Sequence, residues 1–376
     1  MPRTEYMAKA LQLARQGLYT TRPNPRVGCV LVKNDRILGA GAHLKAGEPH
    51  AEIHALRQAG AEAAGADAYV TLEPCSHQGR TPPCADALIK AGVKRVFVGM
   101  QDPNPQVAGR GLARLQAAGI EVESGLLEEA AQALNPGFIR RMQSGRPWLV
   151  AKQAASLDGR TAMASGESQW ITGPEARADV QELRAASCAI ITGIESLLTD
   201  NSRLTVRDER FTGLPGFTQP LRVVLDSQLR CPPSAEIFQQ AGSTLVATLQ
   251  ASRDRKPEEA AALEAAGAEL MLLPAAPCGQ RLDLEALVKA LGARECNQLM
   301  LEAGSQLTGA FLQQGLIDEL RLYLAPRFLG SAARGLLELP GLNKLAAAPE
   351  LEVTEVRAVG KDWRFQLKPL NQPSAQ

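Results

Sequence analysis

The sequence lacks any apolar run approaching the ~18 residues of a membrane-spanning helix. It has no charge of one sign in excess, because 41 Lys and Arg face 40 Asp and Glu, and a net charge of +1 gives no overall basic field for nucleic acid. The first residues show no positive stretch followed by an apolar one, so no secretory signal is expected. Seven cysteines, an odd number in a long chain, argue against a disulfide framework. These absences predict a cytoplasmic protein with reduced thiols that binds neither membrane nor nucleic acid.

The length of the chain predicts two domains. Its 45% hydrophobic and 22% charged residues are ordinary for a globular protein, but 376 residues exceed what one core usually organises. The best linker is the polar stretch 143–147, which contains a glycine and a proline. We therefore expect one domain over residues 1–145 and a second over 146–370, followed by a frayed tail.

Both predicted domains alternate strands with helices. In the first, helices are expected at 5–16, from Pro49 onward, and at 83–91, 111–118 and 126–141, with strands at 27–32, 36–42, 68–72 and 94–100. In the second, strands are expected at 148–152, 188–192, 222–225, 244–248, 269–273, 297–301 and 319–325, with helices at 174–185, 194–198, 257–266, 283–291 and 306–314. The stretch 207–220 is expected to be a loop. This alternation favours an α/β fold with helix-flanked sheets in both domains.

Histidine is scarce, and all four histidines lie within the first 77 residues. His50-Ala51-Glu52 is followed by Pro74-Cys75 and then by Cys84, which supplies the residue types of a zinc deaminase site. In that chemistry one His and two Cys hold Zn²⁺ and leave one position for water, while the Glu moves protons. We predict His50, Cys75 and Cys84 as metal ligands and Glu52 as the catalytic acid–base group. The spacing departs from the general signature, since eight residues rather than two separate the cysteines.

Three other interpretations compete with this one. A closed structural zinc site would add His77 as a fourth ligand, but it has no need of a carboxylate beside His50. A zinc protease would use His50 and His54, but Glu52 stands one place too late for that motif. In the third interpretation, the cysteines are ordinary buried thiols and the histidine is a packed core residue. This explanation is favoured over zinc binding for any one of these residues taken alone, but not for the whole set.

Further polar residues surround these motifs. Asn24, His43 and His77 flank the site in sequence, and Arg80 lies between the two cysteines. In the second domain, two predicted strands each end at a glycine before a helix, at Gly193 and Gly304, where backbone and helix N-terminus favour a phosphate. Between them lies the polar and basic stretch 199–207. From the residues alone, the second domain is expected to be an α/β domain, with phosphate binding at these glycines and plain tight turns as the two alternatives.

Together these motifs resemble the bifunctional riboflavin-biosynthesis deaminase–reductases, and the eight-residue cysteine gap is that family's own spacing. The resemblance runs over nearly the whole chain and rests on short motifs, which are Asn24 to Gly28, His50-Ala51-Glu52, Pro74 to Cys84, Asp102 to Pro105, Lys152, Ser156 to Gly159, Ser168 to Thr172, Asp200-Asn201, Leu204 to Arg207 and Glu302 to Gly304. It implies a cytidine-deaminase-like α/β/α domain followed by a dihydrofolate-reductase-like α/β domain, in a homo-oligomer.

The resemblance also implies two consecutive reactions. The first domain would use Zn²⁺ to deaminate 2,5-diamino-6-(5-phosphoribosylamino)pyrimidin-4(3H)-one. The second would use NADPH to reduce the ribose of 5-amino-6-(5-phosphoribosylamino)uracil to ribityl. By the same resemblance, the cofactor-contacting positions are Ala154, Trp170, Ser196, Asp200 and Gly304, with Asp200 also catalytic. The substrate-binding positions are Asn24, His43, His77, Arg80, Ser168, Arg184, Leu204, Arg207 and Glu302.

Two other functions remain open at this point. A nucleic-acid-editing deaminase would share the zinc site, although the near-zero net charge and the large second domain oppose it. A non-catalytic, zinc-stabilised binding module is opposed by Glu52 and by the polar stretch 199–207.

Overall fold

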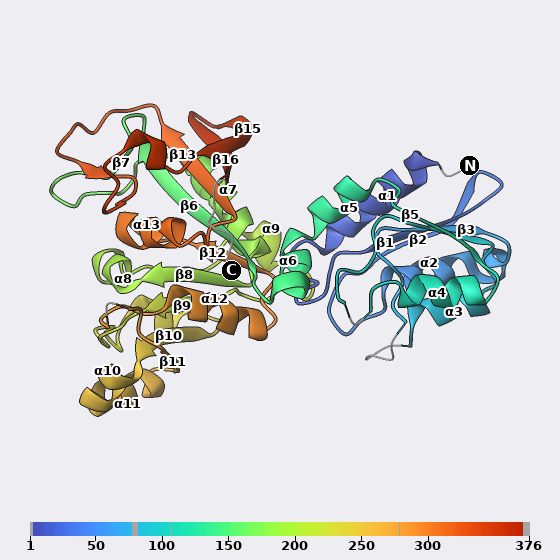
Figure 1. Ribbon diagram of the computed structural model, residues 1–376, viewed down its shortest axis with the longest axis horizontal. Helices are drawn as coiled ribbons and strands as arrows, with labels where there is room; N and C mark the ends of the chain where they lie inside the picture. Colours follow the sequence, from blue (N-terminus) through green and yellow to red (C-terminus); the bar gives the residue numbers. More distant parts are fainter. Residues whose placement is uncertain (1–2, 77–81, 106, 278, 371–376) are drawn as a thin grey trace. The chain divides into compact units, whose positions relative to one another are not determined.

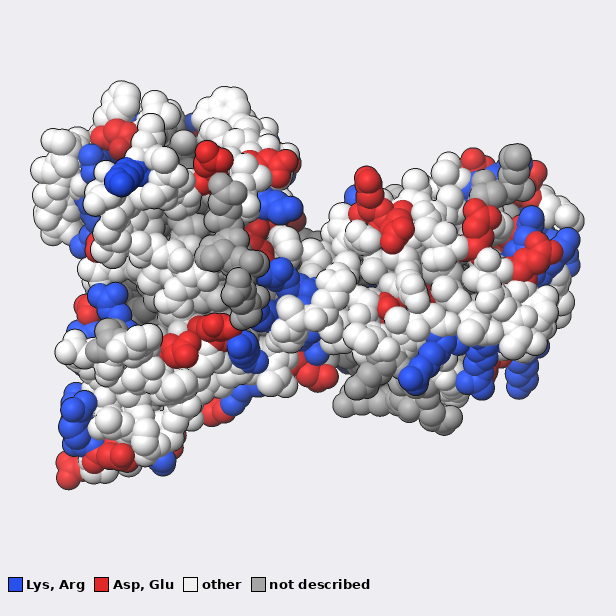
Figure 2. All heavy atoms as spheres, viewed as in Figure 1, with Lys and Arg blue, Asp and Glu red and all other residues white. Residues whose placement is uncertain are grey.

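The computed structural model describes residues 3–76, 82–105, 107–277 and 279–370, and it divides the chain into two compact units (Figure 1). Unit 1 extends to Arg146 and unit 2 begins at Pro147. No helix among the described residues is both long enough and apolar enough to cross a membrane. On the face drawn in Figure 2, acidic and basic side chains are interspersed over each unit.

Unit 1 contains a five-stranded mixed sheet in the order β2-β1-β3-β4-β5. Its strands are β1 (Gly28–Lys33), β2 (Arg36–Ala42), β3 (Asp67–Val70), β4 (Arg95–Val98) and β5 (Glu121–Ser124). Its helices are α1 (Thr4–Ala14), α2 (Ala51–Ala59), α3 (Cys84–Lys90), α4 (Arg110–Ala117), α5 (Glu128–Leu134) and α6 (Pro136–Ser144). The pair β1–β2 is antiparallel, as is β1–β3, whereas β3, β4 and β5 run parallel.

The alternation of side chains along β1 builds two apolar layers. Cys29 and Leu31 pack with α2, α3 and α4, whereas Val30 and Val32 pack with α1 and α5 on the opposite face. Unit 1 is therefore the α/β/α sandwich that the sequence predicts. The parallel part of the sheet places the ends of β3 and β4 at one edge, beside the starts of α2 and α3.

One predicted helix of unit 1 is wrong. The stretch 126–141 is two helices, α5 and α6, separated at Asn135, whose φ of −129° and ψ of 41° are not helical. The following proline disfavours helical backbone at Asn135. The Asn135 side chain instead accepts a hydrogen bond from the Arg26 amide (2.8 Å) and donates one to the Arg26 carbonyl (2.9 Å).

Unit 2 contains a nine-stranded sheet in the order β11-β10-β9-β8-β12-β6-β13-β16-β15. The strands are β6 (Trp148–Ser156), β8 (Ala189–Gly193), β9 (Leu221–Leu225), β10 (Thr244–Leu249), β11 (Ala268–Leu273), β12 (Gln298–Leu301), β13 (Glu319–Ala325), β15 (Leu351–Val359) and β16 (Asp362–Pro369). Seven run parallel from β11 to β13, and β16 and β15 continue antiparallel. A separate two-stranded sheet joins β7 (Arg160–Ala162) to β14 (Arg334–Gly335).

Helices cover both faces of the parallel part of this sheet. The main ones are α7 (Pro174–Ala186), α8 (Ile194–Asp200), α11 (Pro257–Ala265), α12 (Leu284–Ala293) and α13 (Ser305–Gln313). One face of the sheet packs with α12 and α13, and the other packs with α7, α8 and α11. This arrangement agrees with the predicted α/β class.

Several elements of unit 2 escaped the sequence analysis. The expected loop 207–220 contains the short helix α9 (Glu209–Thr212), and α10 (Gln250–Arg255) follows β10. The hairpin β15–β16 was missed although its sequence alternates apolar and polar residues.

Candidate active sites

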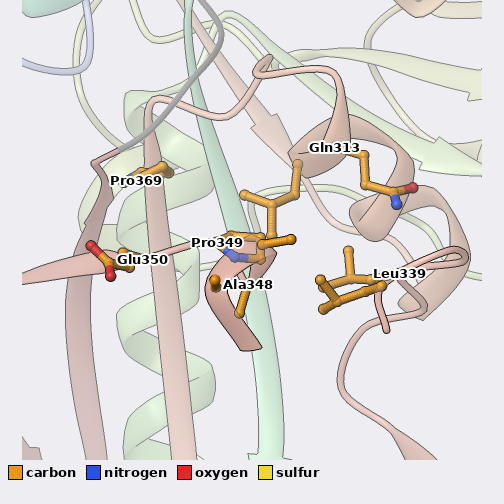
Figure 3. A pocket seen from close by; sticks show the side chains of 10 residues that line it. Gln313, Leu339, Ala348, Pro349, Glu350 and Pro369 are labelled. Carbon is orange, nitrogen blue, oxygen red and sulfur yellow. The ribbon is translucent and has the colours of Figure 1, made fainter. Parts of the chain in front are cut away.

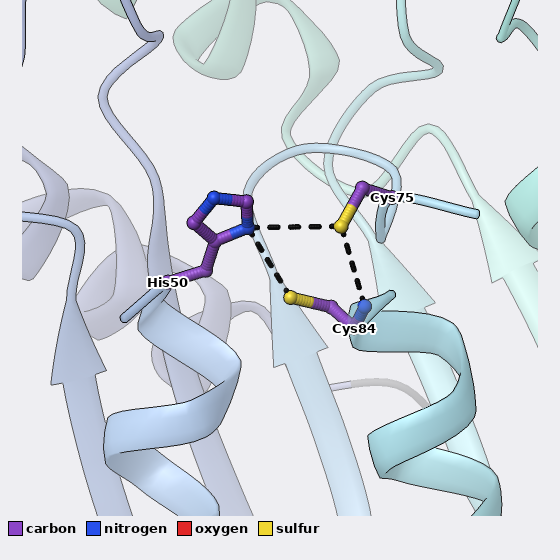
Figure 4. A group of neighbouring side chains, drawn as sticks. All are labelled: His50, Cys75 and Cys84. Atoms are coloured by element: carbon purple, nitrogen blue, oxygen red, sulfur yellow. Dashed lines mark hydrogen bonds between the residues drawn. The ribbon is translucent and has the colours of Figure 1, made fainter. Parts of the chain in front are cut away.

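The three predicted metal ligands meet at the starts of two helices in unit 1. His50 directly precedes α2, Cys84 is the first residue of α3, and Cys75 lies in the segment after β3. The ligand atoms of His50, Cys75 and Cys84 all lie within 4.8 Å of one another, with His50 Nδ1 3.6 Å from Cys75 Sγ and 3.3 Å from Cys84 Sγ (Figure 4). One imidazole and two thiols in this spacing fit a zinc ion and leave a fourth position for water.

The local backbone favours negative charge on the sulfur of Cys75, whereas the hydrogen bond with Cys75 and burial raise the pKa of the Cys84 thiol. The Cys84 amide at the start of α3 donates a hydrogen bond to Cys75 Sγ (3.2 Å). Hydrogen bonding from Cys84, joined by His50 and opposed by burial, lowers the pKa of the Cys75 thiol to about 4. A thiolate is the form that binds a metal, so Cys75 is already in the state that a metal requires.

Glu52 lies in the first turn of α2, two residues after His50, and is buried. Burial raises the pKa of its carboxyl group to about 7. Its Oε2 atom is buried without a hydrogen-bond partner among the residues that the structure describes. A carboxyl with a pKa near neutrality can both take up and release a proton, which is what a general acid–base group needs.

Asn24 and His43 lie beside the metal-ligand set. The Asn24 side-chain nitrogen is 3.0 Å from His43 Nε2, His43 Nδ1 is 3.3 Å from the Pro49 carbonyl oxygen, and the His43 ring meets the His50 ring edge-on at 5.1 Å. Burial lowers the pKa of His43, which keeps the imidazole neutral. Because the Pro49 carbonyl can only accept, His43 Nδ1 carries the proton and Nε2 accepts the hydrogen bond from Asn24. The other two residues predicted here, His77 and Arg80, lie outside the described residues.

Among the described residues, His54 is not part of any group of three or more possible metal ligands. The zinc-protease arrangement that would pair His54 with His50 is therefore absent from this part of the chain. Because His77 is not described, the geometry does not address the closed four-ligand arrangement.

Sequence reasoning missed the role of Glu73. This buried carboxylate, two residues before Cys75, accepts hydrogen bonds from the amides of Asp102 (3.1 Å), Gly109 (3.0 Å) and Gly111 (2.8 Å). A Cβ on Gly111 would lie 2.1 Å from the Pro74 carbonyl oxygen, so this close approach requires glycine. Glu73 thus fixes the segment that carries Cys75 against the loop at 102–111. The sequence shows only a glutamate before Pro74-Cys75, and nothing in it indicates these distant contacts.

In unit 2 the predicted substrate residues Arg184 and Glu302 form a buried ion pair. Arg184 Nε and one terminal nitrogen donate to the two Glu302 oxygens, each at 2.9 Å, and its other terminal nitrogen donates to the Thr205 carbonyl (2.9 Å). Lys152 Nζ, on the neighbouring strand β6, is 3.7 Å from Glu302 Oε1. Burial alone raises the pKa of Glu302, but Arg184 and Lys152 outweigh it and hold that pKa at about 2.

Asp200, at the end of α8, belongs to the same cluster. Burial raises the pKa of its carboxyl group, and the negative charge of Glu302 raises it further. The positive charges of Arg334 and Lys152 act in the opposite direction. The family resemblance includes Lys152 but implies no role for it, and Arg334 was not predicted at all. Arg334 lies about 130 residues from Asp200 in sequence and is brought near it by the short pair β7–β14.

The two glycine turns of unit 2 also meet. Gly304 precedes α13 and Ser196 lies in α8, and a Cβ on Gly304 would be 3.8 Å from Ser196 Oγ. Their strands β12 and β8 are parallel neighbours, so both turns lie at the carboxyl edge where α/β sheets bind nucleotides. Ala154, half-buried on β6, lies two strands from β8 in the same sheet. This edge is where an α/β sheet ordinarily binds a nucleotide cofactor.

The remaining predicted residues of unit 2 differ in how far their side chains are exposed. The Leu204 side chain is buried in the core with a φ of 49°, so only its backbone can face a ligand. Arg207 is exposed, and its amide donates to Gln181 (2.7 Å). Trp170 is 62% exposed, with the Arg177 guanidinium 4.6 Å from its ring centre, while Ser168 is half-buried in the same loop.

The fold and these sites define a two-part enzyme, with a deaminase-type metal centre in unit 1 and a dinucleotide-type reductase edge in unit 2. Comparisons with known families agree: the cytidine and deoxycytidylate deaminase zinc-binding region matches residues 2–100, and the RibD C-terminal domain matches residues 147–365. The chain belongs to the RibD family of riboflavin biosynthesis proteins. It is accordingly a zinc- and NADPH-dependent enzyme of riboflavin biosynthesis that combines deamination with reduction.

Similar proteins cover the chain almost completely. The riboflavin biosynthesis protein RibD of Escherichia coli is 55% identical over 95% of this chain and 96% of its own length, and that of Haemophilus influenzae is 47% identical over 97% and 96%. A solved structure of Acinetobacter baumannii RibD shares 44% identity with a TM-score of 0.89 over 98% of this chain and 99% of its own. A Thermotoga maritima structure, described as a diaminohydroxyphosphoribosylaminopyrimidine deaminase/5-amino-6-(5-phosphoribosylamino)uracil reductase, shares 31% identity with a TM-score of 0.83 over 98% of each chain.

Proposed function

We propose that unit 1 deaminates 2,5-diamino-6-(5-phosphoribosylamino)pyrimidin-4(3H)-one and that unit 2 reduces the resulting 5-amino-6-(5-phosphoribosylamino)uracil with NADPH. The observation that carries the first step is the convergence of His50, Cys75 and Cys84 beside a buried Glu52. The two activities ascribed to the Thermotoga maritima relative support the choice of substrates. The enzyme would be cytoplasmic and homo-oligomeric, and it would bind small molecules rather than nucleic acid.

In the deaminase site, His50, Cys75 and Cys84 would hold zinc, which when bound makes a water molecule acidic enough to act near neutral pH. Glu52 would take one proton from that water and pass it to the ring nitrogen, and it would then take the second proton from the added hydroxyl group and pass it to the leaving amine, because its pKa of about 7 permits both uptake and release. Asn24 and the neutral His43 would orient the pyrimidine. His77 and Arg80 would contact the rest of this substrate.

In the reductase site, the chain would mainly orient two ligands. Gly304, Ser196, Ala154 and Trp170 would contact NADPH, which supplies the hydride. Glu302 and Arg184 would bind the sugar through a pair that is already rigid, and Ser168, the Leu204 backbone and Arg207 would complete the substrate contacts. Asp200 would contact both ligands near the reacting carbon, where Lys152 compensates its charge.

Metal analysis combined with two separate assays tests the proposal. The purified protein should carry one zinc per chain, and Cys84→Ala should lose both the zinc and deamination of the diaminopyrimidine nucleotide. NADPH-dependent reduction of supplied aminouracil nucleotide should stay near wild type in the same variant. Cys231→Ala, which changes a buried cysteine of unit 2, is the matched control for thiol loss. A metal-free protein that still deaminates would refute the role given to the three ligands.

A further inference from the structure

Outside the two candidate active sites, unit 2 has a pocket between α13 and the end of β16 (Figure 3). Its lining is apolar apart from Gln313 and Glu350, and the Gln313 amide already donates to the Pro340 carbonyl oxygen (3.0 Å). The pocket therefore presents little chemistry. In unit 1, by contrast, a buried asparagine contacts the segment that carries a predicted substrate residue.

Asn135 is this buried residue, and both ends of its side-chain amide bind the backbone of Arg26, 109 residues away in sequence. The Asn135 oxygen accepts from the Arg26 amide (2.8 Å), and the Asn135 nitrogen donates to the Arg26 carbonyl oxygen (2.9 Å). The Arg26 guanidinium donates in turn to the Leu134 carbonyl oxygen. Two opposed hydrogen bonds to one residue, as in a hydrogen-bonded pair of a β-ladder, fix both the position and the rotation of its backbone.

The segment 22–27 that contains Arg26 directly precedes β1 and includes neither helix nor strand. Pro23 and Pro25, two of its six residues, have no N–H to donate. The segment therefore has few backbone donors with which to define its own position. A clamp from α5 and α6 matters more here than it would in a regular strand.

Two hydrogen bonds connect the same segment to His43. The Asn24 side-chain nitrogen donates to His43 Nε2 (3.0 Å), and the His43 amide donates to the Val27 carbonyl oxygen (2.9 Å). Arg26, which Asn135 holds, lies between Asn24 and Val27 in sequence. A shift of the Arg26 backbone would therefore move both partners of His43 together.

We propose that Asn135 is a positioning residue of the deaminase site, which holds Asn24 and His43 in the arrangement that receives the pyrimidine; this role rests on the function proposed above for unit 1. Asn135 touches neither the substrate nor a metal ligand and acts through the segment 22–27. It lies outside residues 2–100, the part that the deaminase zinc-binding region matches. Helices α5 and α6 thus complete a site whose other residues lie before them in the chain.

Loss of this clamp should weaken substrate binding more than it slows the reaction. Without Asn135, the Arg26 backbone would lose two hydrogen bonds, and the segment 22–27 would have to be ordered when the substrate binds. The metal-ligand candidates and Glu52 lie on other segments, so the proton transfers should continue. The KM of the deaminase should therefore respond, and its kcat should not.

Steady-state deamination of the diaminopyrimidine nucleotide by the full chain tests this role. Asn135→Ala should raise the KM about 3–10-fold, the effect of one lost neutral hydrogen bond, with kcat and zinc content near wild type. Combined with Asn24→Ala, it should raise the KM by less than the product of the two single effects, because both residues act on one contact. Gln132→Ala, which removes an exposed amide of α5 paired with Glu128, is the matched control and should behave as wild type.

A second measurement does not need the substrate. Nitrogen NMR of the histidine-labelled protein, which has four histidines, reports the hydrogen bond at His43 Nε2. This signal should shift in Asn135→Ala in the direction seen in Asn24→Ala, and it should stay in place in Gln132→Ala. A wild type that does not deaminate the nucleotide would refute the proposed substrate, while the NMR shift would still decide the role of Asn135.

An unchanged KM or an unshifted His43 signal in folded, zinc-loaded Asn135→Ala would overturn the proposal, as would a fall in kcat at constant KM. If Asn135→Ala does not fold, Asn135→Asp decides instead. Its carboxylate still accepts from the Arg26 amide but has no donor for the Arg26 carbonyl oxygen. It should raise the KM in the same direction, and a wild-type KM in this variant would contradict the role given to Asn135.

Discussion

Two glutamates, a buried one in unit 1 and a half-buried one in unit 2, have opposite chemistry. Burial raises the pKa of Glu52 to about 7, whereas Arg184 and Lys152 outweigh burial at Glu302, whose side chain is 18% exposed, and hold its pKa at about 2. The neighbours decide the difference: Glu302 has a bidentate guanidinium at 2.9 Å, and Glu52 has an oxygen without a partner in the described region. An uncompensated carboxyl is suited to exchange protons, while a compensated one is a fixed charge that positions a ligand.

The largest effect on activity is expected from replacing Glu52, the carboxyl group proposed to exchange protons in unit 1. Glu52→Gln should retain zinc but lose about 10²–10⁴-fold in deaminase kcat, because general acid–base groups contribute this much. Reduction of supplied aminouracil nucleotide should be unchanged. Glu62→Gln, an exposed change in the same unit, is the control. Near-normal deamination by Glu52→Gln would assign proton transfer to another group.

Removing the cation beside Glu302 should destabilise unit 2. Arg184→Met leaves a buried carboxylate with only Lys152 near it, and breaking a buried pair in this way costs about 3–5 kcal/mol. Tryptophan fluorescence measures this unit alone, since Trp148, Trp170 and Trp363 all belong to it. Arg294→Met removes the comparable surface pair with Glu269 and should cost at most about 1 kcal/mol. Equal costs in the two variants would contradict the contrast between buried and exposed pairs.

The depressed pKa of Glu302 also predicts a pH dependence. Its folded pKa of about 2 lies below the ordinary 4.5, so its contribution to stability is complete above pH 4.5 and is lost as the pH falls toward 2. At 1.36 kcal/mol per pKa unit the full contribution is about 3 kcal/mol. Denaturant unfolding followed by tryptophan fluorescence should show this loss in wild type and lack it in Glu302→Gln. The same acid dependence in both proteins would mean that other carboxylates cause it.

The smallest expected effect concerns a cation at the surface of unit 2. Arg207→Ala should weaken binding of the aminouracil nucleotide by about 1.5–3 kcal/mol if a hydrogen bond to its phosphate is lost. The change should appear as a raised reductase KM with little change in kcat. Arg203→Ala, which removes the neighbouring exposed arginine paired with Glu236, is the control. An unchanged KM with weaker NADPH binding would move Arg207 to the cofactor side.

Local sequence was enough to predict the α/β class, the types of the candidate metal ligands and the positions of most strands in the core of unit 2. Periodicity and residue chemistry are local properties, so His50, Glu52 and the apolar strands can be recognised without any neighbour. The helix break at Asn135 was missed in the sequence analysis, although the proline that follows it could have indicated the break.

The fold decides which polar and charged groups, far apart in the sequence, become partners in space. Nothing local pairs Glu302 with Arg184, 118 residues away, or brings Arg334 toward Asp200, or ties Glu73 to the amides beyond residue 101. The alternation in β15 and β16 predicts strands with one apolar face, but only the folded sheet shows that α7 covers the charged face and leaves Trp363 exposed. Charge compensation and burial depend on neighbours in space, and the chain order does not specify those neighbours.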